Sequence, residues 1–182
     1  EEAEEELRGA ISLQAEEGVV VKREHVMLHG ILDLDDVSVS EVMTHRNNML
    51  MHDIDVPVQE LIDKVAHSAY TRIPLWKGQT DNILGVLHTK DILQEVQDNW
   101  DDLEKINIQE TLHPPWFVPE TTSLREQLTA FRDKRVHFAL VVDEYGSLMG
   151  LVTLEDILEE IVGDILDEHD IALKNTLASD DG

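Results

Sequence analysis

The chain contains one supersecondary unit twice. The stretch 85–93, GVLHTKDIL, reappears at 150–158 as GLVTLEDIL. Matching positions lie 65 residues apart (150 − 85, 156 − 91), and Leu75 with Leu140 keeps the same offset. Each copy starts at a glycine, continues as an apolar strand and ends in a helix with apolar residues on one face. Two such copies are expected to pack about a pseudo-twofold axis, with a ligand groove between them.

The first repeat is predicted as a short strand, a helix, a hairpin and a second helix. Asp55 is expected to cap the first helix, because apolar residues follow at i, i+3, i+4, i+7 and i+8 from Val58. The strand at 72–76 contains Pro74, so it is expected at a sheet edge or beside a bulge. A turn at 78–82, a strand at 83–87 and a helix at 89–100 complete the unit.

The second repeat follows the same order. A strand at 116–118 opens it, and Ser123 with Glu126 forms a capping box before its first helix. Strands at 136–142 and 148–152 flank a hairpin turn, and a helix at 154–166 closes the unit. One repeat of roughly 55 residues buries too little surface to be stable alone, so the two sheets are expected to pack face to face.

These patterns predict an α/β (α+β) fold of two pseudo-symmetric repeats, each a small sheet with two helices. We predict a helical connector at 1–39, with helices at 4–17 and 22–34, and repeats at 40–107 and 108–170. An acidic tail at 171–182 is expected to be flexible. Because the chain opens on Glu1 without a signal-peptide pattern, we interpret it as part of a longer protein.

Composition excludes several functions. The net charge of −25 disfavours nucleic acid and a polybasic hold on anionic lipid. The acidic ends are interpreted as solvated, with a surface for cations or a basic partner as the alternative. No apolar run approaches the roughly 18 residues needed to cross a bilayer. The absence of cysteine excludes disulfides and thiolate metal sites.

The duplicated element places Thr-x-x-Asp, Thr153 with Asp156, at a strand-to-helix turn. A carboxylate in the first helical turn can accept hydrogen bonds from ribose hydroxyls, and a Thr hydroxyl with free backbone N–H groups can meet phosphate. The same spacing also occurs in an ordinary helix cap with an acid in the first turn. Duplication of the whole context favours a nucleoside site.

Other groups of residues give weaker indications of a metal or catalytic site. His25 and His29 lie one helical turn apart, which suits a metal, but no third ligand is in view. An exposed helix face is therefore favoured, and no metal site is predicted. The sequence has no Ser-His-Asp order, nucleophile elbow or Walker-type loop, so no catalytic residue is predicted. Asp91 and Asp156 occupy equivalent elements, which indicates symmetry rather than a catalytic pair.

The chain resembles a tandem of cystathionine-β-synthase (CBS) domains, the Bateman module, over about residues 7–170. The finer pattern is similar to the cytosolic part of the hemolysin-like CorC/HlyC and CNNM-type family of magnesium and cobalt transporters. The motifs that carry the resemblance are VMTHR at 42–46, SAYTRIP at 68–74, FALVVDEYG at 138–146 and GLVTLEDI at 150–157.

The resemblance implies a regulatory module, not an enzyme, that binds AMP, or ATP with Mg²⁺, between its repeats. It also implies a homodimer formed through the repeats, and an upstream domain in the inner or plasma membrane with this segment in the cytoplasm. Ligand occupancy would be signalled by a conformational change. Two alternatives stay open: a ligand-free structural dimerisation module, and a regulatory domain fused to an enzyme.

The resemblance also implies roles for individual residues. Asp156 would hold the ribose hydroxyls, and Thr153 would meet ribose or phosphate. Thr44 and Arg46 would close the site. The residues implied on the adenine and phosphate side are Tyr70, Thr71, Arg72, Ile73 and Pro74. Positive charge would come from the two arginines, with Mg²⁺ screening the phosphates.

A related site would use Asp91 with the strand around 137–139. Here the first copy departs from the second, because His88 stands where the second copy has Thr153. The hydroxyl is missing at that position, although Thr89 is adjacent. We therefore expect one good nucleotide site and one weak or empty site.

Overall fold

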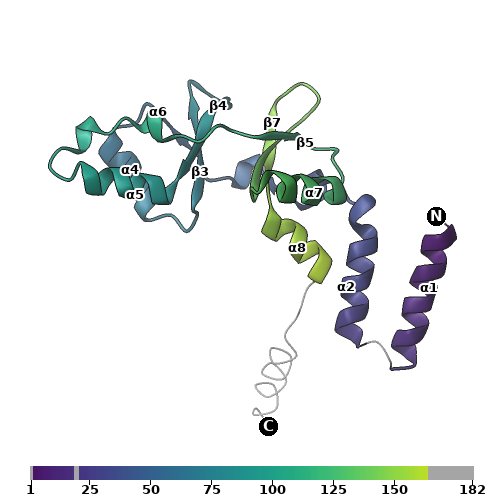
Figure 1. Cartoon of the computed structure of the whole chain (residues 1–182). Helices are drawn as coiled ribbons and strands as arrows, with labels where there is room; N and C mark the ends of the chain where they lie inside the picture. The colour runs from purple at the N-terminus through teal and green to yellow at the C-terminus, as the bar shows by residue number, and fades with distance from the viewer. Residues whose placement is uncertain (1, 19–20, 164–182) are drawn as a thin grey trace, which may run out of the picture. The chain divides into compact units, whose positions relative to one another are not determined.

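Residues 2–18 and 21–163 are described by the computed structural model and form two compact units (Figure 1). The first unit comprises the described residues of Glu1–Ser38, Ser123–Arg135 and Leu154–Gly182, and the second comprises Val39–Thr122 and Val136–Thr153. The predicted acidic tail and the end of the predicted helix at 154–166 lie outside the described residues.

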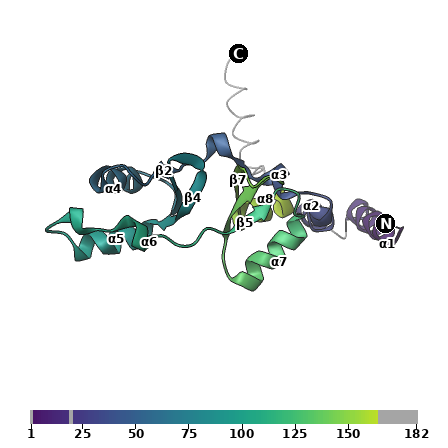
Figure 2. The same ribbon diagram turned by 90° about the horizontal axis from the view of Figure 1, so that it is seen from above.

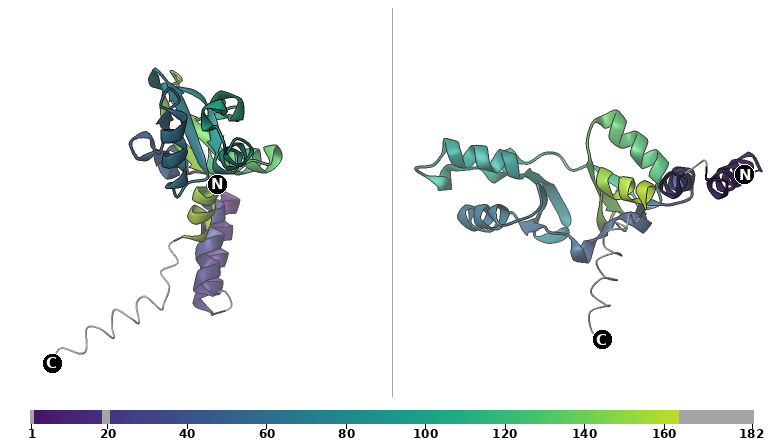
Figure 3. Two further views of the ribbon diagram at one scale, coloured as in Figure 1. Left: turned by 90° about the vertical axis from the view of Figure 1, so that its left-hand side faces the viewer. Right: turned by 90° about the horizontal axis from the view of Figure 1, so that it is seen from below.

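The first unit is helical. Its elements are α1 (Glu2–Glu16), α2 (Lys22–Leu32), the 3-10 turn η1 (Asp33–Asp35), α7 (Leu124–Lys134) and α8 (Leu154–Val162). Helix α2 packs beside both α1 and α8 (Figures 1 and 3). Gly30 makes the second contact possible, because a Cβ there would lie 2.5 Å from the carbonyl oxygen of Ile161. Helices α1 and α2 confirm the two helices predicted before the repeats.

The start of α7 confirms the serine half of the predicted capping box. The Ser123 hydroxyl accepts a hydrogen bond from the Glu126 N–H at 3.3 Å. The Arg125 guanidinium lies 2.6 Å from the carboxylate of Asp35, which links α7 to η1 within the same unit.

The second unit contains two small sheets. One has the order β2-β3-β4, formed by His52–Asp53, Arg72–Lys77 and Gln79–His88. The other has the order β1-β7-β6-β5, formed by Thr44–His45, Leu148–Thr153, Phe138–Val142 and Phe117–Pro119. In each sheet a short strand runs parallel to the first strand of an antiparallel hairpin, β2 beside β3 and β5 beside β6. This correspondence confirms the repeated order predicted from the sequence.

Helices α4 (Val58–Ala66) and α5 (Thr89–Asp98) pack against the three-stranded sheet (Figure 2). The shorter elements of this unit are α3 (Val39–Val42), η2 (Arg46–Asn48), η3 (Leu103–Lys105) and α6 (Ile108–Thr111). Apolar residues of α4, β3, β4, α5 and the segment 106–108 form one buried core: Leu61, Val65, Ile73, Leu75, Leu87, Ile92, Ile106 and Ile108. The helical spacing seen from Val58 onward therefore does mark a buried face.

A second core joins the two sheets. Ile83 of β4 packs with Leu140 of β6 and Leu148 of β7, and partly buried residues including Trp76 and Phe138 surround them. The predicted face-to-face packing of the sheets is confirmed.

Each sheet also receives backbone from the other repeat. We call residues 43–46 and 112–114 the leading segments of the two repeats. In the first, Thr44 pairs with Leu151 of β7. In the second, His113 pairs with Val86 of β4, with both backbone hydrogen bonds formed at 2.9 and 3.0 Å. Val86 and Leu151 are 65 positions apart (151 − 86), so Thr44 and His113 are structural counterparts.

Each leading segment passes close to the backbone of the opposite repeat, and we call this contact a crossing. The glycine that opens each repeated motif permits it. A Cβ on Gly85 would lie 2.8 Å from the carbonyl oxygen of His113. A Cβ on Gly150 would collide with the carbonyl oxygen of Thr44 and lie 2.9 Å from the sulfur of Met43. Both contacts are too short for real atoms, so only glycine fits at either position without a shift.

Pro74 lies in a strand that is central in its sheet rather than at an edge. Its partner Val86 directs both backbone hydrogen bonds to His113, so the missing N–H of Pro74 costs no bond to β4. On the other side, β2 pairs only with Leu75 and Trp76, where the register also shifts. The predicted irregularity is present, and the short length of β2 explains why proline is tolerated.

The predicted cap at Asp55 is wrong. Helix α4 begins at Val58 with Pro57 at the N-cap position, and no side chain caps it. The Asp55 carboxylate instead lies 3.3 Å from the Lys77 ammonium.

Gly150→Ala should destabilise the second unit by about 1–3 kcal/mol, the usual cost of forcing atoms into a packed site. The clash involves the backbone of β1, which cannot turn away as a side chain could. Urea unfolding monitored by circular dichroism measures the change. Gly9→Ala is the matched control, because nothing lies within 4 Å of a Cβ there and alanine favours a helix by about 0.5–1 kcal/mol. Equal stability of the two variants would contradict the assigned role of Gly150.

Stability should also fall in mild acid, in part because of His52. Burial lowers the pKa of His52 below its ordinary 6.5, Lys64 lowers it further and Glu60 opposes the shift. Among the described residues its Nε2 atom is buried without a hydrogen-bond partner. The unfolded chain therefore binds more protons than the folded chain below about pH 6.5, and the free energy of unfolding decreases as pH falls through that value.

Urea unfolding at about pH 7.5 and pH 5.5 tests this effect of His52. His52→Asn should lose less stability between the two pH values than the unchanged protein does. His67→Asn is the control, since the side chain of His67 is 79 % exposed. An unchanged pH dependence in the His52 variant would refute the prediction.

Candidate functional site

The first strand-to-helix turn gathers several predicted residues at one end of the β2-β3-β4 sheet. Arg72 opens β3 and pairs with His88, which closes β4. The Thr89 N–H donates to the carbonyl of Thr71 at 3.0 Å, and the Thr89 hydroxyl donates to the carbonyl of Tyr70 at 3.1 Å. The segment 70–72 is therefore held beside the first turn of α5.

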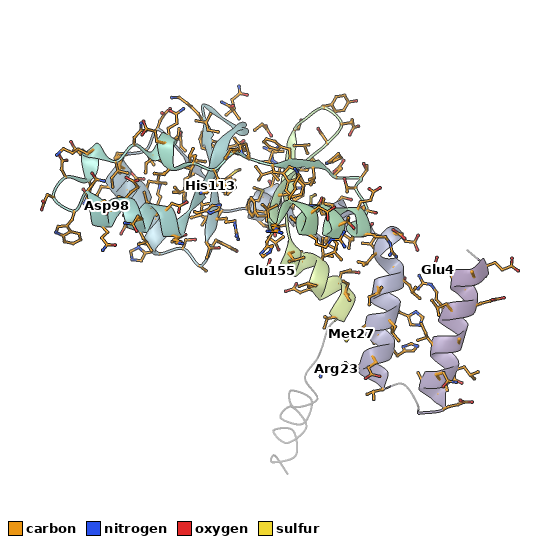
Figure 4. The ribbon with its side chains drawn as sticks, viewed as in Figure 1. Glu4, Arg23, Met27, Asp98, His113 and Glu155 are labelled. Atoms are coloured by element: carbon orange, nitrogen blue, oxygen red, sulfur yellow. The ribbon has the colours of Figure 1, made fainter. Side chains whose placement is uncertain are left out.

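Asp91 lies in that first turn, and its carboxylate is bonded to the protein's own imidazole. Oδ2 of Asp91 lies 2.5 Å from Nε2 of His113 (Figure 4 labels His113). The His113 ring stacks on the ring of His88, with centroids 3.9 Å apart and planes inclined by 10°. Two imidazoles and one carboxylate thus meet where the sequence predicted a weak or empty nucleotide site.

The surroundings of His88 favour its neutral form. Burial lowers the pKa of His88, the neighbouring His113 and Arg72 lower it further, and Asp91 opposes the shift. At neutral pH the His88 imidazole is therefore uncharged and keeps a free lone pair on one ring nitrogen.

The second strand-to-helix turn carries hydroxyls where the first carries imidazoles. Thr153 closes β7, and α8 starts at the next residue with Glu155 and Asp156 in its first turn (Figure 4 labels Glu155). Thr44, the counterpart of His113, pairs with Leu151 on the neighbouring strand. Residues directly opposite share a face of the sheet, as do residues two apart, so Thr44 and Thr153 lie on the same face. Thr153 belongs to the second unit and Asp156 to the first.

Arg46 lies away from that turn. Its guanidinium donates to the Leu148 carbonyl at 3.0 Å, to the Asp81 carboxylate at 3.2 Å and to the Thr80 hydroxyl at 3.3 Å. Leu148 opens β7 and Thr153 closes it, so these contacts lie roughly 16 Å from Thr153 at about 3.3 Å per residue of strand. Arg46 connects the two sheets in this arrangement.

The remaining predicted residues differ in access. Tyr70 is exposed and Arg72 is half-buried, so both side chains can meet a ligand. Ile73 and Pro74 are buried, and the Ile73 side chain is part of the core beneath α4 and α5. Ile73 therefore shapes the end of the sheet from within.

Sequence reasoning missed His113. It lies outside the duplicated motif, and it is separated from its counterpart Thr44 by 69 positions (113 − 44) instead of 65. The only sequence signal was the replacement of the motif threonine by His88, which marks the first turn as chemically different but does not identify a partner.

Comparison with known proteins identifies the repeats. Residues 39–98 and 108–163 each match the CBS domain family. The chain is 37 % identical over 163 residues to hemolysin C of Brachyspira hyodysenteriae, covering 90 % of this chain and 59 % of that protein. It is 38 % identical over 144 residues to the magnesium and cobalt efflux protein CorC of Pasteurella multocida, covering 79 % of this chain and 47 % of that protein. The chain thus spans about half the length of these relatives.

Solved structures give the same result. The CBS domain of the bacterial CNNM/CorC family Mg²⁺ transporter matches with a TM-score of 0.80 and 37 % identity, covering 90 % of this chain and 98 % of that one. A complex of such a domain with ATP matches with a TM-score of 0.71 and 39 % identity, covering 78 % and 99 %. A CBS-domain pair with bound AMP from Klebsiella pneumoniae matches with a TM-score of 0.64 and 35 % identity, covering 70 % and 99 %.

The two matched segments coincide with the duplicated strand-turn-helix element seen in the sequence and in the two sheets. The chain belongs to the CBS domain family, as a tandem CBS pair of the CorC/CNNM type.

Proposed function

We propose that this CBS pair is the regulatory adenine-nucleotide-binding module of a membrane transporter for magnesium or cobalt. The observation that carries the proposal is the ATP complex of a CNNM/CorC domain that is 39 % identical and 99 % covered by this chain. The AMP complex of the Klebsiella pair supports the same ligand class. The described residues include no helix that is both long and apolar enough to cross a membrane. In the proposal, an upstream domain spans the membrane and this pair lies on its cytoplasmic side.

The proposed nucleotide site is centred on Asp156. A carboxylate in the first turn of α8 can accept the two ribose hydroxyls, while N–H groups at the helix start meet phosphate. Thr153 and Thr44 share a sheet face and would add hydroxyl donors to ribose and phosphate. The proposed adenine and phosphate side is Tyr70, Thr71, Arg72, Ile73 and Pro74, with Ile73 acting from the core.

Positive charge for the phosphates is proposed to come from Arg72. Among the described residues it makes no ion pair, whereas Arg46 is bonded to Asp81. We therefore propose that Arg46 acts by fixing the leading segment that carries Thr44. ATP would bring Mg²⁺, which screens its phosphates against a chain of net charge −25.

The site at Asp91 is proposed to bind nucleotide weakly. Its carboxylate would have to leave His113 before accepting ribose hydroxyls. The hydroxyl of Thr89, the nearest substitute for Thr153, already donates to the Tyr70 carbonyl. Both groups that a nucleotide needs there are occupied by the protein.

Asp156→Ala should lower nucleotide affinity about 10- to 100-fold, because it removes charged hydrogen bonds worth roughly 1.5–3 kcal/mol. Calorimetric titration with AMP, ADP and ATP, with and without Mg²⁺, measures the loss. Asp91→Ala is the matched control at the equivalent position and should change affinity little. Equal losses in both variants would contradict the assignment of the strong site, and no binding of any nucleotide by the unchanged protein would leave a structural dimerisation module.

Signalling is proposed to follow from differential binding. A nucleotide shifts an equilibrium between two arrangements of the module only if it binds one of them more tightly. A tenfold preference supplies about 1.4 kcal/mol, which is within the usual range for coupling between sites. In this proposal nucleotide binding breaks no covalent bond, so the site needs no catalytic group.

We also propose that the repeats form a homodimer. On α5, Leu93 is 58 % exposed and Trp100, just beyond it, is 77 % exposed. Leu158 of α8, at the position equivalent to Leu93, is exposed as well.

Leu93→Asp should shift the protein toward monomer in sedimentation equilibrium, since it buries a charge in an apolar contact. Leu28→Asp on α2, also exposed but outside the repeats, should leave the mass unchanged, and a monomeric parent protein would refute the dimer.

A further inference from the structure

Three metal-ligating side chains converge at the first strand-to-helix turn. His88 closes β4, Asp91 lies in the first turn of α5, and His113 follows α6. One ligand atom from each of these side chains lies within 4.8 Å of the other two. In the described part of the chain this is the one group of three histidine or acidic side chains gathered so closely.

We propose that His88, Asp91 and His113 bind a divalent transition-metal ion of the Zn²⁺ class. Two imidazole nitrogens and one carboxylate oxygen are a ligand set that Zn²⁺ accepts at about 2.0–2.2 Å, with a fourth position left for water. Mg²⁺ and Ca²⁺ prefer oxygen ligands throughout, so this set disfavours both. The site goes beyond the nucleotide role proposed above. His88 and Asp91 belong to the first repeat, and His113 belongs to the leading segment of the second repeat.

The backbone holds all three residues in place before any metal arrives. Both backbone hydrogen bonds to Val86 fix His113, and strand pairing with Arg72 fixes His88. The start of α5 is tied down through Thr89. Ligation therefore needs only side-chain rotation, and little conformational entropy is lost in assembling the site.

Two local changes must accompany binding. The imidazole rings are stacked and nearly parallel, so their lone pairs lie in two separate parallel planes and at least one ring must tilt for both to meet one ion. The proton in the contact between His113 and Asp91 must leave, because metal replaces it. Half-exposed side chains at His113 and Asp91 give an ion a path from solvent.

The second repeat provides an internal comparison. The positions equivalent to His88 and His113 are Thr153 and Thr44, so the imidazole pair of the first turn is a hydroxyl pair in the second. Neutral threonine hydroxyls are poor ligands for Zn²⁺ but suit ribose and phosphate. The same scaffold thus presents imidazole and carboxylate ligands suited to Zn²⁺ at one strand-to-helix turn, and the proposed nucleotide ligands at the other.

Calorimetry with Zn²⁺ on the whole chain, and visible absorption of bound Co²⁺, test the proposal. One Zn²⁺ per chain is expected, with Co²⁺ giving the d–d bands of a low-coordinate nitrogen and oxygen site. His88→Thr, which installs the residue of the second repeat, and His113→Ala should each weaken binding by more than the roughly 10- to 100-fold that outer-shell changes cost. The backbone bonds of His113 remain in the alanine variant, and circular dichroism checks that both variants fold.

Three controls distinguish this metal site from other imidazole pairs, from Mg²⁺ binding and from the proposed nucleotide site. His25→Ala with His29→Ala removes a second close imidazole pair among the described residues, whose centroids lie 4.5 Å apart, and should leave Zn²⁺ affinity unchanged. Mg²⁺ in large excess should not displace Zn²⁺. Asp156→Ala should also leave Zn²⁺ binding intact, so failure of the nucleotide proposal and failure of the metal proposal are distinguishable. Zn²⁺ binding that survives in His88→Thr and His113→Ala, or that disappears with His25 and His29, would overturn the assignment.

Discussion

The contact between a leading segment and the glycine of the opposite repeat is the constraint on which the second unit depends. The Thr44 carbonyl lies against Gly150, and the His113 carbonyl lies against Gly85. A sheet of two or three short strands is marginal in water, and its open edge would be a pairing hazard. Each repeat therefore completes the sheet of the other, and neither sheet is complete without both copies of the motif. Each of these glycines lets the two backbones approach closely, and neither is needed to form a turn.

The same crossing makes a symmetric scaffold chemically asymmetric. Because Thr44 and His113 occupy equivalent positions, the residue at the crossing decides which side chain reaches the neighbouring strand-to-helix turn. Histidine there bonds Asp91 and stacks on His88, a contact that a ribose would have to displace. Threonine at the other crossing is shorter and places a hydroxyl, in place of an imidazole, on the face that carries Thr153. Two differences at matched positions therefore distinguish the two turns, and the different ligands proposed for them rest on these differences.

The sequence predicted the elements well because the duplication tests each assignment twice. The helices around Leu61 and Phe131, the hairpins and the sheet-on-sheet core follow from periodicity and turn residues that recur at one offset. The prediction was wrong at Asp55, where Pro57 fixes the helix start. The partnership of His113 with Asp91 could not be predicted, because it depends on strand register across an insertion that breaks the offset. His113 pairs with Val86 across a long stretch of sequence, so no local pattern predicts that pairing.

Thr44 and Arg46 show how a ligand at one sheet can act on the other. The two residues are separated by a single position, so a force on Thr44 acts directly on the segment that Arg46 anchors. Arg46 bonds both the Leu148 carbonyl of one sheet and the Asp81 carboxylate of the other, and Asp81 also accepts the Leu148 N–H at 3.0 Å. A nucleotide that repositions Thr44 would therefore strain a polar link between the sheets rather than only a local loop. Hydrogen bonds of this kind are either formed or broken, so in the proposed function such a link would have two discrete arrangements whose populations nucleotide binding could shift.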